Sequence, residues 1–198
     1  MNRSKIGPIV TAVILSIAAV FLYLNRETGT SSKGLEGIPK TAPKGAGGGG
    51  ETPIGDEVIK NHIEIAAVWL PSVGMAGMPD PSGDVIHVEA DVRATANNPN
   101  GFAKDEFVPY LKIKYEVVDP KSGKSLQSGD LMPMVANDGL HYGANIARPA
   151  PGTYRLVYKI DPPSAGGLGR HSDKATGVAS WWEPFEVSFE WVMDRAGK

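Results

Sequence analysis

The segment that decides the fold is DVIHVEADVRA, from Asp84 to Ala94. Apolar residues occupy every second position, and the positions between them hold His87, Glu89, Asp91 and Arg93. A period of two places the apolar side chains on one face of a β-strand and the polar ones on the other. The segment therefore predicts a strand with one face in a hydrophobic core and a polar face outside that core.

The same alternation recurs along the chain. Further strands are predicted at His62–Leu70, 111–117, Ser125–Ala136, His141–Ile146, 154–160 and 185–191. Turns rich in Pro, Gly, Asn and Asp separate them, and no stretch of this body has a convincing helical period. About seven short strands with such turns are typical of a β-sandwich of immunoglobulin-like type. We therefore expect an all-β body over residues 57–198.

The amino terminus has the pattern of a membrane anchor. Residues 6–24, IGPIVTAVILSIAAVFLYL, contain no charged residue. As a helix they are about 28 Å long, close to the thickness of a bilayer's hydrocarbon core. The run ends in bulky residues before Asn25 and Arg26, unlike the small-residue exit of a cleaved signal peptide. We expect a retained transmembrane helix in residues 1–25, with a cleaved signal as the alternative and the body on the outer side of the membrane.

Residues 26–56 are predicted to be a linker. They include Pro39, Pro43 and the run from Gly45 to Gly50, a composition that does not build a core. The charge changes at this point, from +4 over residues 1–50 to −6 over residues 51–198. The near-neutral net charge of −2 gives no positive field that would attract nucleic acid. Nucleic acid is therefore excluded as an expected partner.

Composition also restricts the chemistry. The chain has no cysteine, which excludes disulfides, thiolate metal sites, cysteine nucleophiles and a lipid-modified cysteine. It has no GxSxG, HExxH or P-loop motif. We therefore expect a protein that is not an enzyme.

Three histidines have neighbours that suit a metal. His87 and Glu89 share one face of a strand, although a solvated strand face explains the pair as well. Met134 and His141 flank the turn at Asn137–Gly139, and a thioether with an imidazole is a ligand set that suits copper. Core filling is the alternative for the methionine. His171 follows the glycine-rich run at residues 166–169, where an exposed loop histidine is the plainer interpretation.

A second pair of methionines lies in the segment GMAGM. Met75 and Met78 are spaced so that they could receive a soft metal, but an ordinary loop with two apolar residues is the favoured interpretation.

Several blocks of the body resemble the periplasmic iron-transport proteins that accompany bacterial high-affinity iron permeases. The resemblance covers about residues 58–193 and is carried by EIAAVWL (64–70), HVEADV (87–92), NNPNGF (97–102), VPYLKI (108–113), LMPMVANDGLHYGANI (131–146), GRHSDKATGV (169–178) and WWEPFEV (181–187).

This resemblance implies a homodimeric immunoglobulin-like domain with a copper site near the dimer interface. Its implied metal ligands are His87, Glu89, Met134, His141 and His171, with Asp138 as a supporting or iron-related group. It implies an iron permease of the inner membrane as partner and a location on the periplasmic side of that membrane. Asn137 stands where many relatives have a second aspartate, which puts a carboxylate-rich iron subsite in question.

The expected function is therefore a copper-binding accessory protein for iron uptake, which delivers iron or manages its redox state. Iron is the second expected metal. Two alternatives remain at this stage: a copper chaperone or buffer without an iron role, and a metal-free interaction module on an anchored stalk.

Overall fold

The computed structural model describes residues 50–194. The predicted strand around Asp84 is present as β4 (Val85–Ala94). It pairs with β3 (Ile63–Pro71) and with β7 (Gly139–Ala147), both antiparallel. The other elements are β1 (Thr52–Pro53), β2 (Val58–Lys60), β5 (Lys112–Val118), β6 (Ser125–Ala136), β8 (Gly152–Asp161), the 3-10 helix η1 (Pro163–Gly166) and β9 (Phe185–Met193). The all-β class is thus confirmed.

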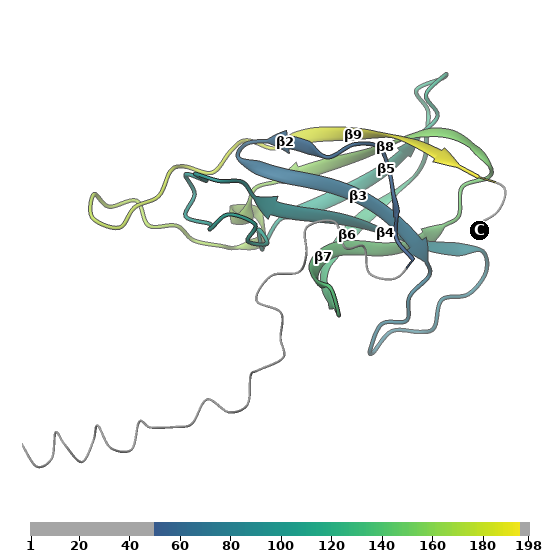
Figure 1. Ribbon diagram of the computed structural model, residues 1–198, viewed down its shortest axis with the longest axis horizontal. Coiled ribbons are helices and arrows are strands. Elements are labelled where there is room, and N and C mark those ends of the chain that lie inside the picture. Colours follow the sequence, from purple (N-terminus) through teal and green to yellow (C-terminus); the bar gives the residue numbers. More distant parts are fainter. Residues whose placement is uncertain (1–49, 195–198) are drawn as a thin grey trace, which may run out of the picture. The chain divides into compact units, whose positions relative to one another are not determined.

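The strands form one curled sheet in the order β1-β3-β4-β7-β6-β5-β8-β9, and β2 pairs with β3 (Figure 1). β6 makes the curl possible because it serves both halves of the sheet. Its first part, up to Leu131, pairs with β5, and its second part, from Met132 to Ala136, pairs with β7. The narrower immunoglobulin-like sandwich stays a prediction.

The core lies between the two halves of the curled sheet. The apolar face of β4 contributes Val88, Ala90 and Val92, all fully buried. β8 and β9 contribute large aromatic residues to the same core, among them Tyr158 and Trp191. The Tyr158 hydroxyl donates a hydrogen bond of 2.8 Å to the Glu89 carbonyl oxygen. Because β8 and β4 are not neighbours in the sheet, this bond shows that the two halves face each other across the core.

Strand pairing begins before the body predicted from the sequence. Thr52 and Pro53 of β1 pair with Trp69 and Val68 of β3, inside the stretch interpreted as linker. The predicted transmembrane helix at residues 6–24 and most of the predicted linker lie outside the described residues. Within residues 50–194, no helix has the length and apolar character needed to cross a membrane.

Candidate metal centre

The register of three neighbouring strands assembles the candidate site on the outer face of the sheet. In the pairing of β4 with β7, His87 lies opposite Asn145 and Glu89 lies opposite Gly143. In the pairing of β6 with β7, Met134 lies opposite His141. Side chains alternate across a strand, so this face is the one opposite the core face of Val88 and Ala90.

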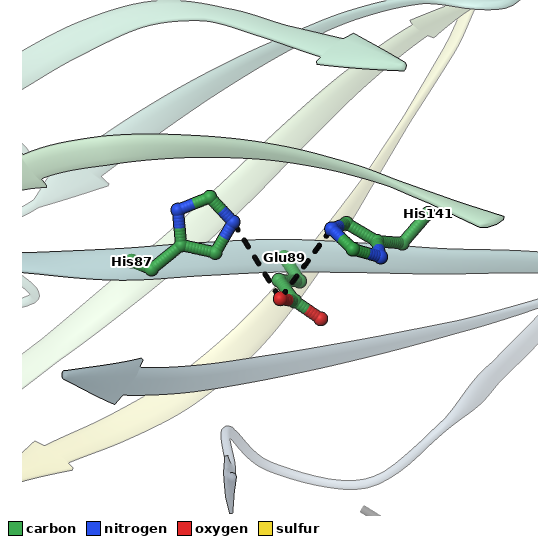
Figure 2. A group of neighbouring side chains, drawn as sticks. All are labelled: His87, Glu89 and His141. Atoms are coloured by element: carbon green, nitrogen blue, oxygen red, sulfur yellow. Dashed lines mark ion pairs between the residues drawn. The ribbon is translucent and has the colours of Figure 1, made fainter. Parts of the chain in front are cut away.

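Two imidazoles converge on one carboxylate. The Nε2 atoms of His87 and of His141 each lie 3.5 Å from Oε1 of Glu89. One ligand atom from each residue lies within 4.8 Å of the others. Figure 2 shows the two rings on either side of the carboxylate, with the ring nitrogens pointing toward it. Three donor atoms at this spacing could hold a metal ion.

The polar face of β4 is not open to solvent, contrary to what the alternation predicts. His87 is 0% exposed, Glu89 5% and His141 4%. The interpretation of the His87–Glu89 pair as a solvated strand face was therefore wrong. Alternation separates core from non-core positions, but it does not say whether neighbouring segments cover the second face. The segment after β3 lies against this face beside His87, since Val73 is hydrogen-bonded to Asn145.

Asn145 fixes which nitrogen of His87 carries the proton. Its amide Nδ2 donates to the Val73 carbonyl oxygen at 2.8 Å, so Oδ1 is left facing the Val73 amide and His87. That oxygen lies 3.0 Å from Nδ1 of His87, and as an acceptor it requires a proton on Nδ1. The lone pair is therefore on Nε2, which is buried and has no hydrogen-bond partner among residues 50–194. A buried nitrogen with a free lone pair is poised to bind a metal.

Gly143 provides the space for the His87 ring. A Cβ at this position would lie 2.6 Å from Nε2 of His87 and 3.0 Å from its Cε1. Any side chain here would displace the imidazole, which explains why glycine stands opposite Glu89.

The electrostatics favour a cluster without charge. Burial, followed by the nearby carboxylates of Glu51, Asp91 and Asp138, raises the pKa of Glu89 to about 8. Burial also lowers the pKa of His87 and of His141 below the usual value for histidine. At neutral pH the three residues are thus a protonated carboxyl and two neutral imidazoles, despite their short separations. A cation arriving here meets neutral nitrogen lone pairs and displaces the carboxyl proton.

Two more of the predicted residues border the cluster. Met134 is half-buried and lies across the strand pair from His141, on the same face of the sheet. Asp138 is half-buried in the β6–β7 turn, and its charge acts on Glu89, Asp91 and His141. Its Oδ1 atom has no hydrogen-bond partner in the described part of the chain.

His171 does not join the cluster. It lies in the segment between η1 and β9, and its side chain is 75% exposed. Thr176 donates its hydroxyl proton to Asp173 at 2.7 Å, so Nδ1 of His171 must donate to the Thr176 oxygen, also at 2.7 Å. Nδ1 of His171 therefore carries a proton, as Nδ1 of His87 does, but the ring lies at an exposed position.

Asn145 and Gly143 were not among the residues predicted from the sequence. The available signal was the period of two along β7, which places His141, Gly143 and Asn145 on one face. Their roles depend on the register with β4 and on the position of Val73, and neither can be derived from β7 alone.

The fold and the site define a class: an all-β domain with a buried histidine–glutamate–histidine candidate metal centre on its outer sheet face. Residues 48–194 match the family described as Fe2+ transport protein, and the chain belongs to that family.

Solved relatives share this fold. FetP from uropathogenic Escherichia coli strain F11 is 45% identical with a TM-score of 0.69, covering 74% of this chain and 98% of its own. Copper-reconstituted P19 from Campylobacter jejuni is 44% identical with a TM-score of 0.68, covering 73% and 96%. A UPF0423 protein of Brucella abortus is 46% identical over 154 residues, covering 75% of this chain and 84% of its own. Membership of the expected family is thereby confirmed, and copper is the metal in the solved P19 relative.

Proposed function

We propose that this protein binds copper at His87, Glu89 and His141 and serves as an extracytoplasmic accessory protein in iron uptake. The observation that carries the proposal is the buried Nε2 of His87. It has no hydrogen-bond partner among the described residues and lies 3.5 Å from the carboxylate that His141 also contacts.

The donor set fits copper. Neutral imidazoles bind copper in either oxidation state, and the thioether of Met134 on the same sheet face favours Cu(I). Because the cysteine-free chain offers no thiolate, the softest ligand available here is a methionine. Copper, when bound, supplies a one-electron redox couple. The solved copper-bound relatives support the same choice of metal.

The chain's own residues prepare and protect the site. Asn145 holds the Nδ1 proton of His87, so that Nε2 stays available as a ligand. Glu89 keeps its proton at neutral pH and releases it when a cation needs the carboxylate. The burial of all three side chains keeps bulk water away and strengthens their electrostatic interactions.

Iron is proposed as the cargo rather than the resident metal. Carboxylate oxygens suit iron better than they suit Cu(I), and Glu51, Asp91 and Asp138 all act electrostatically on Glu89. These acids support a hard-ligand region beside the copper site, although Asn137 contributes no charge to it. An inner-membrane iron permease is the proposed recipient, as membership of an Fe2+ transport family suggests.

Assembly and location are further parts of the proposal. A homodimer would let His171 of a second copy reach the site, which agrees with the exposure of its side chain. Residues 1–25 would tether the domain on the periplasmic side of the membrane. The curled sheet would then correspond to the immunoglobulin-like sandwich expected from the strand pattern. Binding and transfer, without catalytic turnover, suffice for this role.

Chelator-competition titrations of the full-length chain with copper test the proposal. His141→Ala is expected to lose most of the affinity. His62→Ala, which removes an exposed histidine far from the cluster in sequence, is the matched control and should retain it. Equal affinity in both variants would contradict the copper site.

A cellular assay tests the iron role. Deletion of the protein should limit growth on scarce iron, and His141→Ala should fail to restore that growth. A deletion that changes copper tolerance alone would instead support the copper buffer.

A further inference from the structure

The loop between β3 and β4 presents two thioethers that the buried site does not use. Met75 and Met78 stand at the first and fourth positions of a turn, with the Met78 amide donating to the Met75 carbonyl oxygen at 3.1 Å. Gly77, at the third position, has φ +78°, as a type II turn requires. Such a turn brings the two Cα atoms within about 7 Å of each other. Both side chains therefore start from neighbouring points.

These methionines are not core residues. Met78 is 43% exposed and Met75 is half-buried, whereas Met193 of β9 is 2% exposed. A Cβ on Gly74 or on Gly77 would meet no heavy atom within 4 Å, so the turn has open space around it. Long, flexible thioether side chains in open space can both contact one metal ion.

The same loop is fastened to the buried site. Asn145 accepts a hydrogen bond from the Val73 amide at 3.3 Å and donates one to its carbonyl oxygen at 2.8 Å. The same amide oxygen contacts His87 at 3.0 Å. Only Gly74 separates Val73 from Met75, so the turn lies close along the chain to Asn145, which contacts the candidate metal ligand His87.

From this placement we infer that Met75 and Met78 form a receiving site for a soft monovalent cation, Cu(I), on the route into the buried centre. The destination of the ion rests on the proposed function, whereas the receiving site at Met75 and Met78 does not. Thioether sulfur selects Cu(I) over hard cations, and two sulfurs on one turn bind it as a chelate. The copper keeps its oxidation state as it passes from the loop to the buried ligands.

Silver(I) is the probe for the site, because it is soft, monovalent and stable to redox chemistry. The full-length chain, labelled at the methionine methyl groups, is titrated with silver in the His141→Ala background, which disables the buried centre. The Met75 and Met78 methyl signals should shift together along one binding curve. Met75→Leu should weaken that binding roughly 100-fold, because the second sulfur otherwise binds at high effective concentration. Methyl signals that stay unmoved, or that follow two separate curves, would overturn the inference.

Loading kinetics test the route. With a Cu(I) chelate as donor, the Met75→Leu/Met78→Leu variant should fill the buried site about tenfold more slowly, as expected if about 1.4 kcal/mol of binding along the route is lost. Its final affinity should equal that of the wild type. Met193→Leu, which removes a thioether from the core, is the control and should load at the wild-type rate.

The outcomes separate the two proposals. Wild-type loading by the double variant, or a loss of final affinity in it, would overturn the receiving site. A buried centre that fails to bind copper while silver still binds the loop would overturn only the proposed function.

Discussion

Gly143→Ala tests the geometry of the buried site most sharply. The added Cβ would lie 2.6 Å from Nε2 of His87, whereas ordinary van der Waals contact begins at 3.4 Å. The difference, 3.4 Å minus 2.6 Å, means that the ring and the β7 backbone must move apart by about 0.8 Å. The ring is completely buried and its Nδ1 is hydrogen-bonded to Asn145, so any movement of the ring disturbs its packing and that hydrogen bond.

A shift of this size removes His87 as a ligand, because metal–ligand distances tolerate only about 0.2 Å. We expect copper affinity to fall about 100-fold, the upper range for disturbed ligand orientation. That loss corresponds to about 2.8 kcal/mol of binding free energy. Chelator-competition titration measures it directly, and thermal unfolding measures the stability of the same variant.

Gly129→Ala is the matched control. It too lies inside a strand, and its Cβ would lie 2.8 Å from Cε1 of the Tyr115 ring. Both variants overpack a buried ring and should lose about 1–3 kcal/mol of stability. Only Gly143→Ala should lose copper affinity. A folded Gly143→Ala protein with wild-type affinity, or an equal loss in both variants, would refute the reasoning.

Four further predictions follow from the same geometry. Copper binding at pH 7 should release most of one proton, because a carboxyl with a pKa of about 8 is mostly protonated there. Calorimetry in buffers of different ionisation enthalpy measures the release, and Glu89→Gln should abolish it. Because the pKa of Glu89 is raised in the fold, its contribution to the stability of the metal-free protein is fully present below about pH 4.5 and is lost as the pH rises through about 8. At pH 9, metal-free Glu89→Gln should therefore unfold at a higher temperature than the wild type. A lower unfolding temperature for the variant would contradict the direction of the shift. Asn145→Leu should lower copper affinity about 10- to 100-fold and let the His87 proton occupy either ring nitrogen, which altered imidazole ¹⁵N shifts would report. An unchanged tautomer of His87 would show that Asn145 does not determine it. Tyr142→Phe should cost about 1–3 kcal/mol of stability in denaturant unfolding, because the buried hydroxyl is hydrogen-bonded to both Leu111 and Val108. The variant should keep its copper affinity, since Tyr142 faces the core. A loss of copper binding would contradict this separation of stability from binding.

The strands could be predicted because alternation is a local property. The segment from Asp84 to Ala94 alone indicates which residues of β4 face the core, and the structure agrees at Val88 and Ala90. The division of β6 between two partners could not be predicted in the same way. Which part of β6 pairs with β5 and which with β7 depends on how the whole sheet curls.

The site was predictable in part. His87 and Glu89 share a face by their spacing, and the turn at Asn137–Gly139 directs attention to His141. Their meeting depends on the register of β4 with β7, which no local pattern determines. The burial of the site depends on tertiary packing, and the role of Asn145 depends on its hydrogen bonds with Val73. Within one chain, His171 lies outside the cluster of His87, Glu89 and His141, whereas the family resemblance implies that all of them are ligands of one metal.

The central claim is that His87 and His141 of one chain ligate copper together. Electron paramagnetic resonance of the full-length chain, labelled with ¹⁵N-histidine and loaded with one equivalent of Cu(II), tests it most directly. We expect hyperfine coupling to imidazole nitrogens from both residues. One coupling should be lost in His87→Ala and one in His141→Ala, and none in His62→Ala. A spectrum that neither His87→Ala nor His141→Ala changes would contradict it.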